Sequence, residues 1–225
     1  RSLRRLDDVW RESGEAVVGH FGLEFTDTTP ELKSAYFFYE SKSMLNREGT
    51  INGDQGIWIK RSYFDRLGGF DESLPFLEDS RLVSKVFNEG GRWLLLPGVL
   101  KTSARRFEME GFWPRMVLNA LIRNFDQMAF TRFFDRAPEV YEHQRGLSGE
   151  LNLLPFCQLI HMLFEELSVE ELSAVHKGTG EYVRENLWQV MFSLDCAAAR
   201  RGLAEPSEVE SRWLDWFDGW SSMLD

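Results

Sequence analysis

Residues 53–106, GDQGIWIKRSYFDRLGGFDESLPFLEDSRLVSKVFNEGGRWLLLPGVLKTSARR, alternate short apolar runs with glycine-rich turns. Two of these runs, 57–59 and 92–96, have the length and composition of strands. Residues 61–67 and 76–88 have apolar side chains at helical spacing, and each stretch ends at a glycine pair, where left-handed backbone is accessible. Alternation of strand and helix predicts an α/β fold for this block.

The residues on either side extend this pattern in different ways. Upstream, the sequence predicts a strand over 17–25 and a helix over 31–46. Within the block, the turn residues Pro97-Gly98 predict the end of the strand that begins at Arg92. Beyond Phe107 only helical spacing is found. The predicted helices of this part cover 112–134, 150–166, 168–177, 180–201 and 207–223. The sequence thus predicts a mixed sheet with flanking helices over 1–140 and an all-helical segment over 141–225.

Composition limits the classes of function. The chain of 225 residues has a net charge of −10 and a pI near 5.0, which argues against a nucleic-acid-binding protein. It has no apolar run of the ~18 residues that a membrane-spanning helix requires. We therefore expect a cytoplasmic protein.

The cysteines and histidines predict no metal or catalytic site. Cys157 and Cys196 form no CxxC pair, and we expect both to be buried free thiols, which fits a reducing compartment. The four histidines are scattered, none lies at ligand spacing with another, and we expect no His/Cys metal spacing in the chain, so we interpret all four as non-catalytic. They are His20, His143, His161 and His176.

Five short motifs in the block from Gly53 to Arg106 resemble the second half of a family 2 glycosyltransferase of the GT-A type, in particular a bacterial group. They are Gly53-Asp54-Gln55-Gly56, Lys60-Arg61, Gly68-Gly69-Phe70, Leu77-Glu78-Asp79 and Thr102-Ser103-Ala104-Arg105-Arg106. The resemblance covers roughly residues 15–130. It implies that 1–140 is the acceptor-side half of a Rossmann-like GT-A domain.

The resemblance assigns catalysis to the acidic pair. An inverting sugar transfer needs a base that removes the proton of the acceptor hydroxyl. In this family the base is a carboxylate at a helix start, here Asp79 with Glu78 beside it, where the helix N-terminus favours a negative charge. The alternative is that both acids only complement the helix dipole.

The resemblance also implies a set of substrate-binding residues. The turn of Gly53, Asp54 and Gln55 would hydrogen-bond sugar hydroxyls, or form a simple turn. The cations of this set would bind a diphosphate. The alternative is that they are solvated surface charges. They are Lys60, Arg61, Arg105 and Arg106.

The implied ligands are a nucleotide sugar, an acceptor that is a sugar or a lipid alcohol, and Mg²⁺ or Mn²⁺ in the intact enzyme. The nucleotide-binding half and its acidic metal motif have no match here, so we expect the metal ligands outside this chain. We also expect the chain by itself to bind nucleotide sugars poorly.

The helical part leaves several alternatives open. Residues 112–125 form either a core helix, which we favour, or a helix lying on a membrane surface. Trp213, Trp216, Phe217 and Trp220 share one helical face, which is typical of a core or a partner interface. Homo-oligomer formation also stays open. The alternative function is therefore a non-catalytic, transferase-like module that binds a partner through its C-terminal helices.

Overall fold

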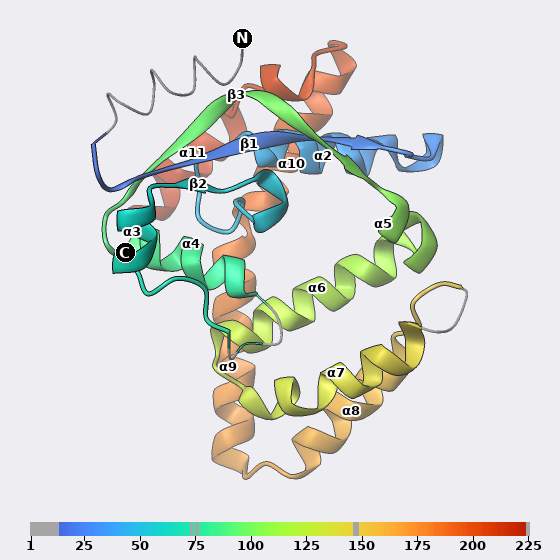
Figure 1. Cartoon of the computed structure of the whole chain (residues 1–225). Helices are drawn as coiled ribbons and strands as arrows, with labels where there is room; N and C mark the ends of the chain where they lie inside the picture. The colour runs from blue at the N-terminus through green and yellow to red at the C-terminus, as the bar shows by residue number, and fades with distance from the viewer. Residues whose placement is uncertain (1–13, 73, 75–76, 146–148, 224–225) are drawn as a thin grey trace. The chain divides into compact units, whose positions relative to one another are not determined.

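The computed structural model of the protein describes residues 14–72, 74, 77–145 and 149–223, with the side chains of 142–145 left out (Figure 1). Contacts divide the chain into two compact units, which are described separately. The first comprises the residues up to Ser103 together with Ala199–Val209, and the second comprises Ala104–Ala198 and the residues from Glu210. The fold is mixed α/β and mostly helical, in agreement with the predicted class. The division into a transferase half and a helical segment at 140/141 stays a prediction.

The first unit contains a three-stranded mixed sheet. Its strands are β1 (Val17–Thr26), β2 (Trp58–Ile59) and β3 (Arg92–Ser103), in the order β2-β1-β3. β1 pairs with β2 antiparallel and with β3 parallel. The strands predicted at 17–25 and 57–59 are therefore confirmed.

The strand β3 is longer than predicted. The sequence predicts that Pro97-Gly98 ends it and that 99–103 is extended; the end at Pro97 is wrong, because β3 continues through the extended residues to Ser103. The register shifts there, since Leu95 pairs with His20 and Val99 pairs with Gly22. The proline has no N–H for the ladder, and Gly98 takes a φ of 105°, so the pair is absorbed as a bulge.

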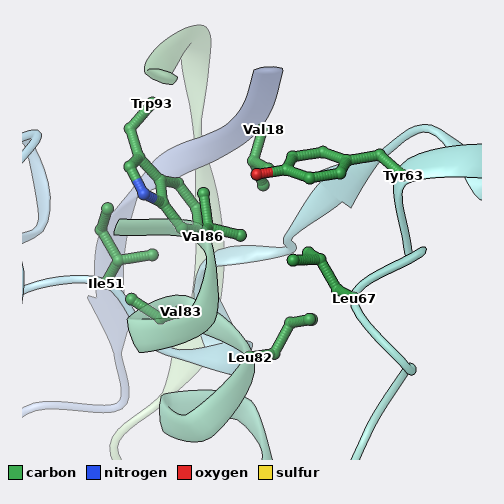
Figure 2. Close-up of a cluster of buried hydrophobic side chains, with 8 residues drawn as sticks. All are labelled: Val18, Ile51, Tyr63, Leu67, Leu82, Val83, Val86 and Trp93. Carbon is green, nitrogen blue, oxygen red and sulfur yellow. The ribbon is translucent and has the colours of Figure 1, made fainter. Parts of the chain in front are cut away.

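Helices cover this sheet and supply much of its core. They are η1 (Pro30–Leu32), α2 (Lys33–Ser43), η2 (Gly53–Gln55), α3 (Arg61–Arg66), α4 (Glu78–Asn88) and η3 (Pro206–Glu208). Apolar residues of α3 and α4 pack with residues of β1 and β3 into one buried cluster (Figure 2). Its members are Val18, Ile51, Tyr63, Leu67, Leu82, Val83, Val86 and Trp93. Burial of this cluster holds the start of α4 in place relative to the sheet.

Side chains of α2 satisfy the backbone of β1 beyond the end of β2. The N–H of Leu23 donates to Ser43 Oγ over 2.7 Å, and the N–H of Phe25 donates to Glu40 Oε1 over 2.7 Å. Figure 1 shows α2 running alongside β1. Burial, opposed by the hydrogen bond from Phe25, raises the pKa of Glu40. Two backbone donors of a strand edge are thus bound by one helix.

The second unit is helical throughout its described residues. Its helices are α5 (Arg105–Glu110), α6 (Phe112–Gln127), α7 (Thr131–Arg145), α8 (Leu154–Glu165), α9 (Val169–Asn186), most of α10 (Trp188–Arg201) and α11 (Arg212–Ser221). The absence of strands beyond Phe107 is confirmed for the described residues. The helix predicted over 112–134 is instead two helices, separated by a turn in which Ala129 has a φ of 52°.

The break predicted between Lys177 and Gly180 is absent, because α9 runs through both glycines. A Cβ on Gly178 would lie 3.2 Å from Cβ of Met128. The glycine therefore allows close packing of α9 against the turn after α6, which its sequence neighbourhood does not reveal.

The apolar face of α6 is buried. Leu118, Ile122 and Phe125 are all less than a tenth exposed, and Phe125 packs against Phe133 of α7 with ring centroids 4.6 Å apart. This burial supports the core-helix interpretation of 112–125. Among the described residues, no helix is long and apolar enough to cross a membrane.

The start of α11 is bound by a buried carboxylate of α10. Asp195, 3% exposed, accepts hydrogen bonds from the N–H groups of Trp213 (2.9 Å) and Leu214 (3.0 Å). Nearby in the chain, Cys196 is buried, as predicted. Cys157 on α8 is exposed, so the prediction of burial is wrong for this residue.

Candidate functional site

The GDQG turn is a single turn of 3-10 helix held by the side chain of Gln55. Gln55 is fully buried; its Oε1 accepts from the N–H of Asn52 (3.0 Å), and its Nε2 donates to the carbonyl of Ser43 (3.1 Å). Asn52 and Gln55 form a capping box at the start of η2 (Gly53–Gln55). The turn ends at Gly56, which has a φ of 64°. These contacts give Gln55 a role in the turn, and its contact with a sugar stays a prediction.

The side chain of Asp79 meets this turn. The backbone N–H of Gly53 donates to Asp79 Oδ2 over 2.6 Å, although the residues are 26 positions apart in sequence. Asp79 Oδ1 accepts from the N–H of Ser80 over 2.7 Å. A Cβ on Gly53 would lie 3.1 Å from Asp79 Oδ2, so a residue larger than glycine would crowd this contact. Two of the five motifs, GDQG and LED, are therefore side by side.

The two acids of the LED motif differ in their surroundings. Glu78 is exposed, whereas Asp79 is partly buried against η2, and both lie in the first turn of α4. Each carboxylate oxygen has two lone pairs. Asp79 Oδ1 accepts from both the N–H and the hydroxyl of Ser80, whereas Oδ2 accepts only from Gly53 in the described structure and keeps acceptor capacity. Asp54 is exposed in the middle of η2. Asp79 is thus fixed in position while still able to accept a proton.

The residue before the acidic pair has an unusual backbone conformation. Leu77, which caps α4, has a φ of 65° and a ψ of 22°, in the left-handed region. A residue with a Cβ pays about 1–2 kcal/mol for this conformation. The left-handed residue turns the chain abruptly into α4 and presents Asp79 to η2.

The first two candidate cations have carboxylate partners within the first unit. Lys60 Nζ lies 3.2 Å from Glu15 Oε1, and Arg61 Nε lies 2.8 Å from Asp65 Oδ1. The hydrogen bond from Lys60, followed by that from Ser62, lowers the pKa of Glu15. Both pairs are solvent-exposed and weak, so they leave the cations available for exchange of partners.

The other two candidate cations belong to the second unit. Arg105 and Arg106 are exposed at the start of α5, and Arg106 Nε lies 3.9 Å from Glu110 Oε1. Their role toward a diphosphate stays a prediction. Of the histidines, His20 is buried in β1, His161 and His176 are exposed, and the side chain of His143 lies outside the described residues.

The described residues offer no group of three or more His, Cys, Asp or Glu side chains positioned as metal ligands. The ligands of the Mg²⁺ or Mn²⁺ that the resemblance implies for the intact enzyme are expected outside this chain, and this stays a prediction.

Two residues that shape this site, Asn52 and Leu77, are not among the predicted site residues. Asn52 has the spacing of a capping box with the predicted site residue Gln55, and this spacing is visible in the sequence. The left-handed Leu77 has no such signal, because leucine is uncommon in that conformation.

Comparisons with known proteins identify no relative of this chain. No family model, no curated protein and no solved structure matches the chain. Assignment of the site therefore rests on its motifs and their geometry.

Proposed function

We propose that this chain provides the acceptor-side, catalytic-base part of a GT-A-type glycosyltransferase that transfers a sugar from a nucleotide sugar to an acceptor hydroxyl. The observation that carries this proposal is the contact between Gly53 N and Asp79 Oδ2. Two motifs of the resembled family, distant in sequence, meet in space at a partly exposed carboxylate. A carboxylate that only complements a helix dipole needs no such partner.

The role of Asp79 is that of a general base. As the acceptor oxygen bonds to the anomeric carbon and the bond from that carbon to the diphosphate breaks, Asp79 takes the proton of the acceptor hydroxyl. The bond from Gly53 and the N-terminus of α4 hold the carboxylate in place. Inversion at the anomeric carbon follows from the resemblance.

The backbone at Leu77 supports the same proposal. Strained left-handed residues persist where the surrounding structure requires them, and they are frequent at active sites. Leu77 directly precedes the acidic pair and determines how α4 begins.

The proposal is tested by replacing Asp79 in the full-length protein that contains this chain. Asp79→Asn keeps an oxygen that can accept from Gly53 but loses the base, so we expect transfer to fall by about 10²–10⁴-fold. The measurement is release of nucleoside diphosphate from a panel of UDP-, GDP- and dTDP-sugars, with Mg²⁺ or Mn²⁺ and sugar or lipid-alcohol acceptors.

Glu78→Gln is the matched control, because Glu78 is the exposed neighbour in the same helical turn. We expect it to change transfer by less than about tenfold, since the proposal gives it no proton to remove. An unchanged rate in Asp79→Asn, with the fold intact, contradicts the assignment of the base. Failure of the full-length protein to bind any donor of the panel contradicts the transferase proposal itself.

A second candidate, a non-catalytic binding module, is favoured by an exposed apolar stripe in the second unit. Val183, Leu187, Val190 and Leu194 are each at least two-fifths exposed, with the four-three-four spacing of a helix–helix seam. Trp213, Trp216 and Trp220 on α11 are also about half exposed. If the module is correct, Val190→Glu with Leu194→Glu abolishes self-association in sedimentation, whereas Asp79→Asn leaves it intact.

A further inference from the structure

The exposed face of α8 presents a thiol, an imidazole and a carboxylate on successive turns. Cys157, His161 and Glu165 are spaced four residues apart, and all three are exposed. On a helix, four-residue spacing places side chains on one face, with about 5–6 Å between neighbouring Cβ atoms. The four-residue spacing of Cys157 and His161 is present in the sequence, contrary to the expectation that the chain has no His/Cys metal spacing.

Glu165 lies within hydrogen-bonding distance of the imidazole. His161 Nε2 lies 3.3 Å from Glu165 Oε1. With the proton on Nε2 donated to that carboxylate, the lone pair of the neutral ring is on Nδ1. Metal-binding histidines are held in this way by a carboxylate on the second ring nitrogen, which fixes the tautomer and the ring orientation.

We propose that Cys157 Sγ and His161 Nδ1 chelate one divalent cation of the Zn²⁺ class. A thiolate and an imidazole bind Zn²⁺ and related borderline cations in preference to Mg²⁺ or Ca²⁺, which favour oxygen ligands. Binding displaces the thiol proton to solvent, and water molecules complete a tetrahedral shell. Glu165 acts as a positioning residue.

Two protein ligands make this a different kind of site from a structural zinc centre. Both ligands lie on one helix, four residues apart, a spacing that places them on the same face of α8. The proposal is independent of the glycosyltransferase assignment, because none of its residues belongs to η2 or α4.

The test is titration of the whole chain with Co²⁺, a spectroscopic substitute for Zn²⁺, in buffer with a non-thiol reductant. We expect a near-ultraviolet thiolate-to-Co²⁺ charge-transfer band that saturates at one equivalent and is displaced by Zn²⁺. Cys157→Ser removes the band. His161→Asn weakens binding by about tenfold or more, and Glu165→Gln weakens it by roughly tenfold through loss of imidazole orientation.

Two matched variants control for nonspecific binding. Cys196→Ser removes the buried thiol of α10, and His176→Asn removes an exposed histidine of α9. Both are expected to keep the band and the affinity of the unaltered chain. The proposal is overturned if the unaltered chain gives no band, if the band survives Cys157→Ser, or if His161→Asn binds Co²⁺ as tightly as the unaltered chain.

Discussion

Asp79 shows what sequence motifs can and cannot say about a single residue. The LED motif identifies it as an acid at a helix start, and α4 does begin at Glu78. The motif does not say where the side chain points, because that depends on packing between α4 and the sheet. The hydrogen bond from Gly53 is therefore a result of the structure, and catalysis by Asp79 stays a proposal.

The strain at Leu77 makes a prediction about stability. We expect the free energy of unfolding of Leu77→Gly to be about 1–2 kcal/mol higher than that of Glu78→Gly. Glycine at position 77 relieves the left-handed backbone, whereas glycine at position 78 weakens the first turn of α4. Both variants add the same freedom to the unfolded chain, so the difference reports the folded backbone.

Urea unfolding of the two glycine variants, followed by circular dichroism, gives this difference. Equal stabilities, or a less stable Leu77→Gly, would show that the left-handed conformation carries no strain or that loss of the leucine side chain outweighs it.

Among the elements, those defined by local signals were the best predicted. The strand β1, the helix α3 and its glycine terminator follow from apolar spacing and from Gly68 and Gly69, whose φ angles are 82° and 68°. The errors occur where tertiary contacts override a local breaker. Pairing with β1 carries β3 through Pro97, and packing against Met128 retains Gly178 inside α9.

The cap of α11 by Asp195 gives a prediction at the level of elements. Asp195→Ala leaves two N–H groups of the first turn without their acceptor, so we expect a loss of about 2–3 kcal/mol in the free energy of unfolding. Asp215→Ala, which removes an exposed acid from the same turn, is expected to cost less than about 1 kcal/mol.

Chemical denaturation of both alanine variants measures these losses, and helical content near the C-terminus can be followed by hydrogen exchange. If Asp195→Ala and Asp215→Ala were equally stable, the buried carboxylate would not be the group that fixes α11.

At the scale of the whole molecule, the sequence predicted the mixed α/β class of the fold. Apolar periodicity distinguishes strands from helices, and so a mixed sheet followed by helices could be expected. Assignment of Ala199–Val209 to the first unit depends on long-range contacts that no local pattern encodes. For the same reason the sequence could name Gln55 as a site residue without revealing that it is buried.

Stability of the whole chain should depend on pH through His20. His20 is fully buried in β1; its Nε2 lies 2.8 Å from Asn46 Oδ1, and its Nδ1 has no partner in the described structure. Burial lowers the pKa of His20 from its ordinary value of 6.5, and the hydrogen bond that its Nε2 donates to Asn46 Oδ1 opposes this shift only in part. His20 therefore binds a proton more readily in the unfolded chain than in the folded chain.

Because the folded-state pKa is below the unfolded value, stability due to neutral His20 is complete above pH 6.5 and declines as the pH falls toward the folded-state pKa. One such group contributes a slope of at most about 1.4 kcal/mol per pH unit. The raised pKa of Glu40 acts in the opposite direction, so the test compares variants.

Urea unfolding at about pH 7.5 and about pH 5.5 should show a smaller acid-induced loss for His20→Gln than for the unaltered chain. His176→Gln, at an exposed histidine, should match the unaltered chain. An identical pH dependence in all three proteins would exclude His20 as its source.

Through Ser43 and Glu40, α2 accepts hydrogen bonds from backbone N–H groups of β1 that a fourth strand could otherwise bind. Unwinding this one helix would free the N–H groups of Leu23 and Phe25 together, next to a strand already aligned with β3. Such a surface is a template on which another extended chain can add, so intermolecular sheet growth would begin here. The helix that shields the sheet is thereby also the element whose loss would turn the folded chain into a seed for aggregation.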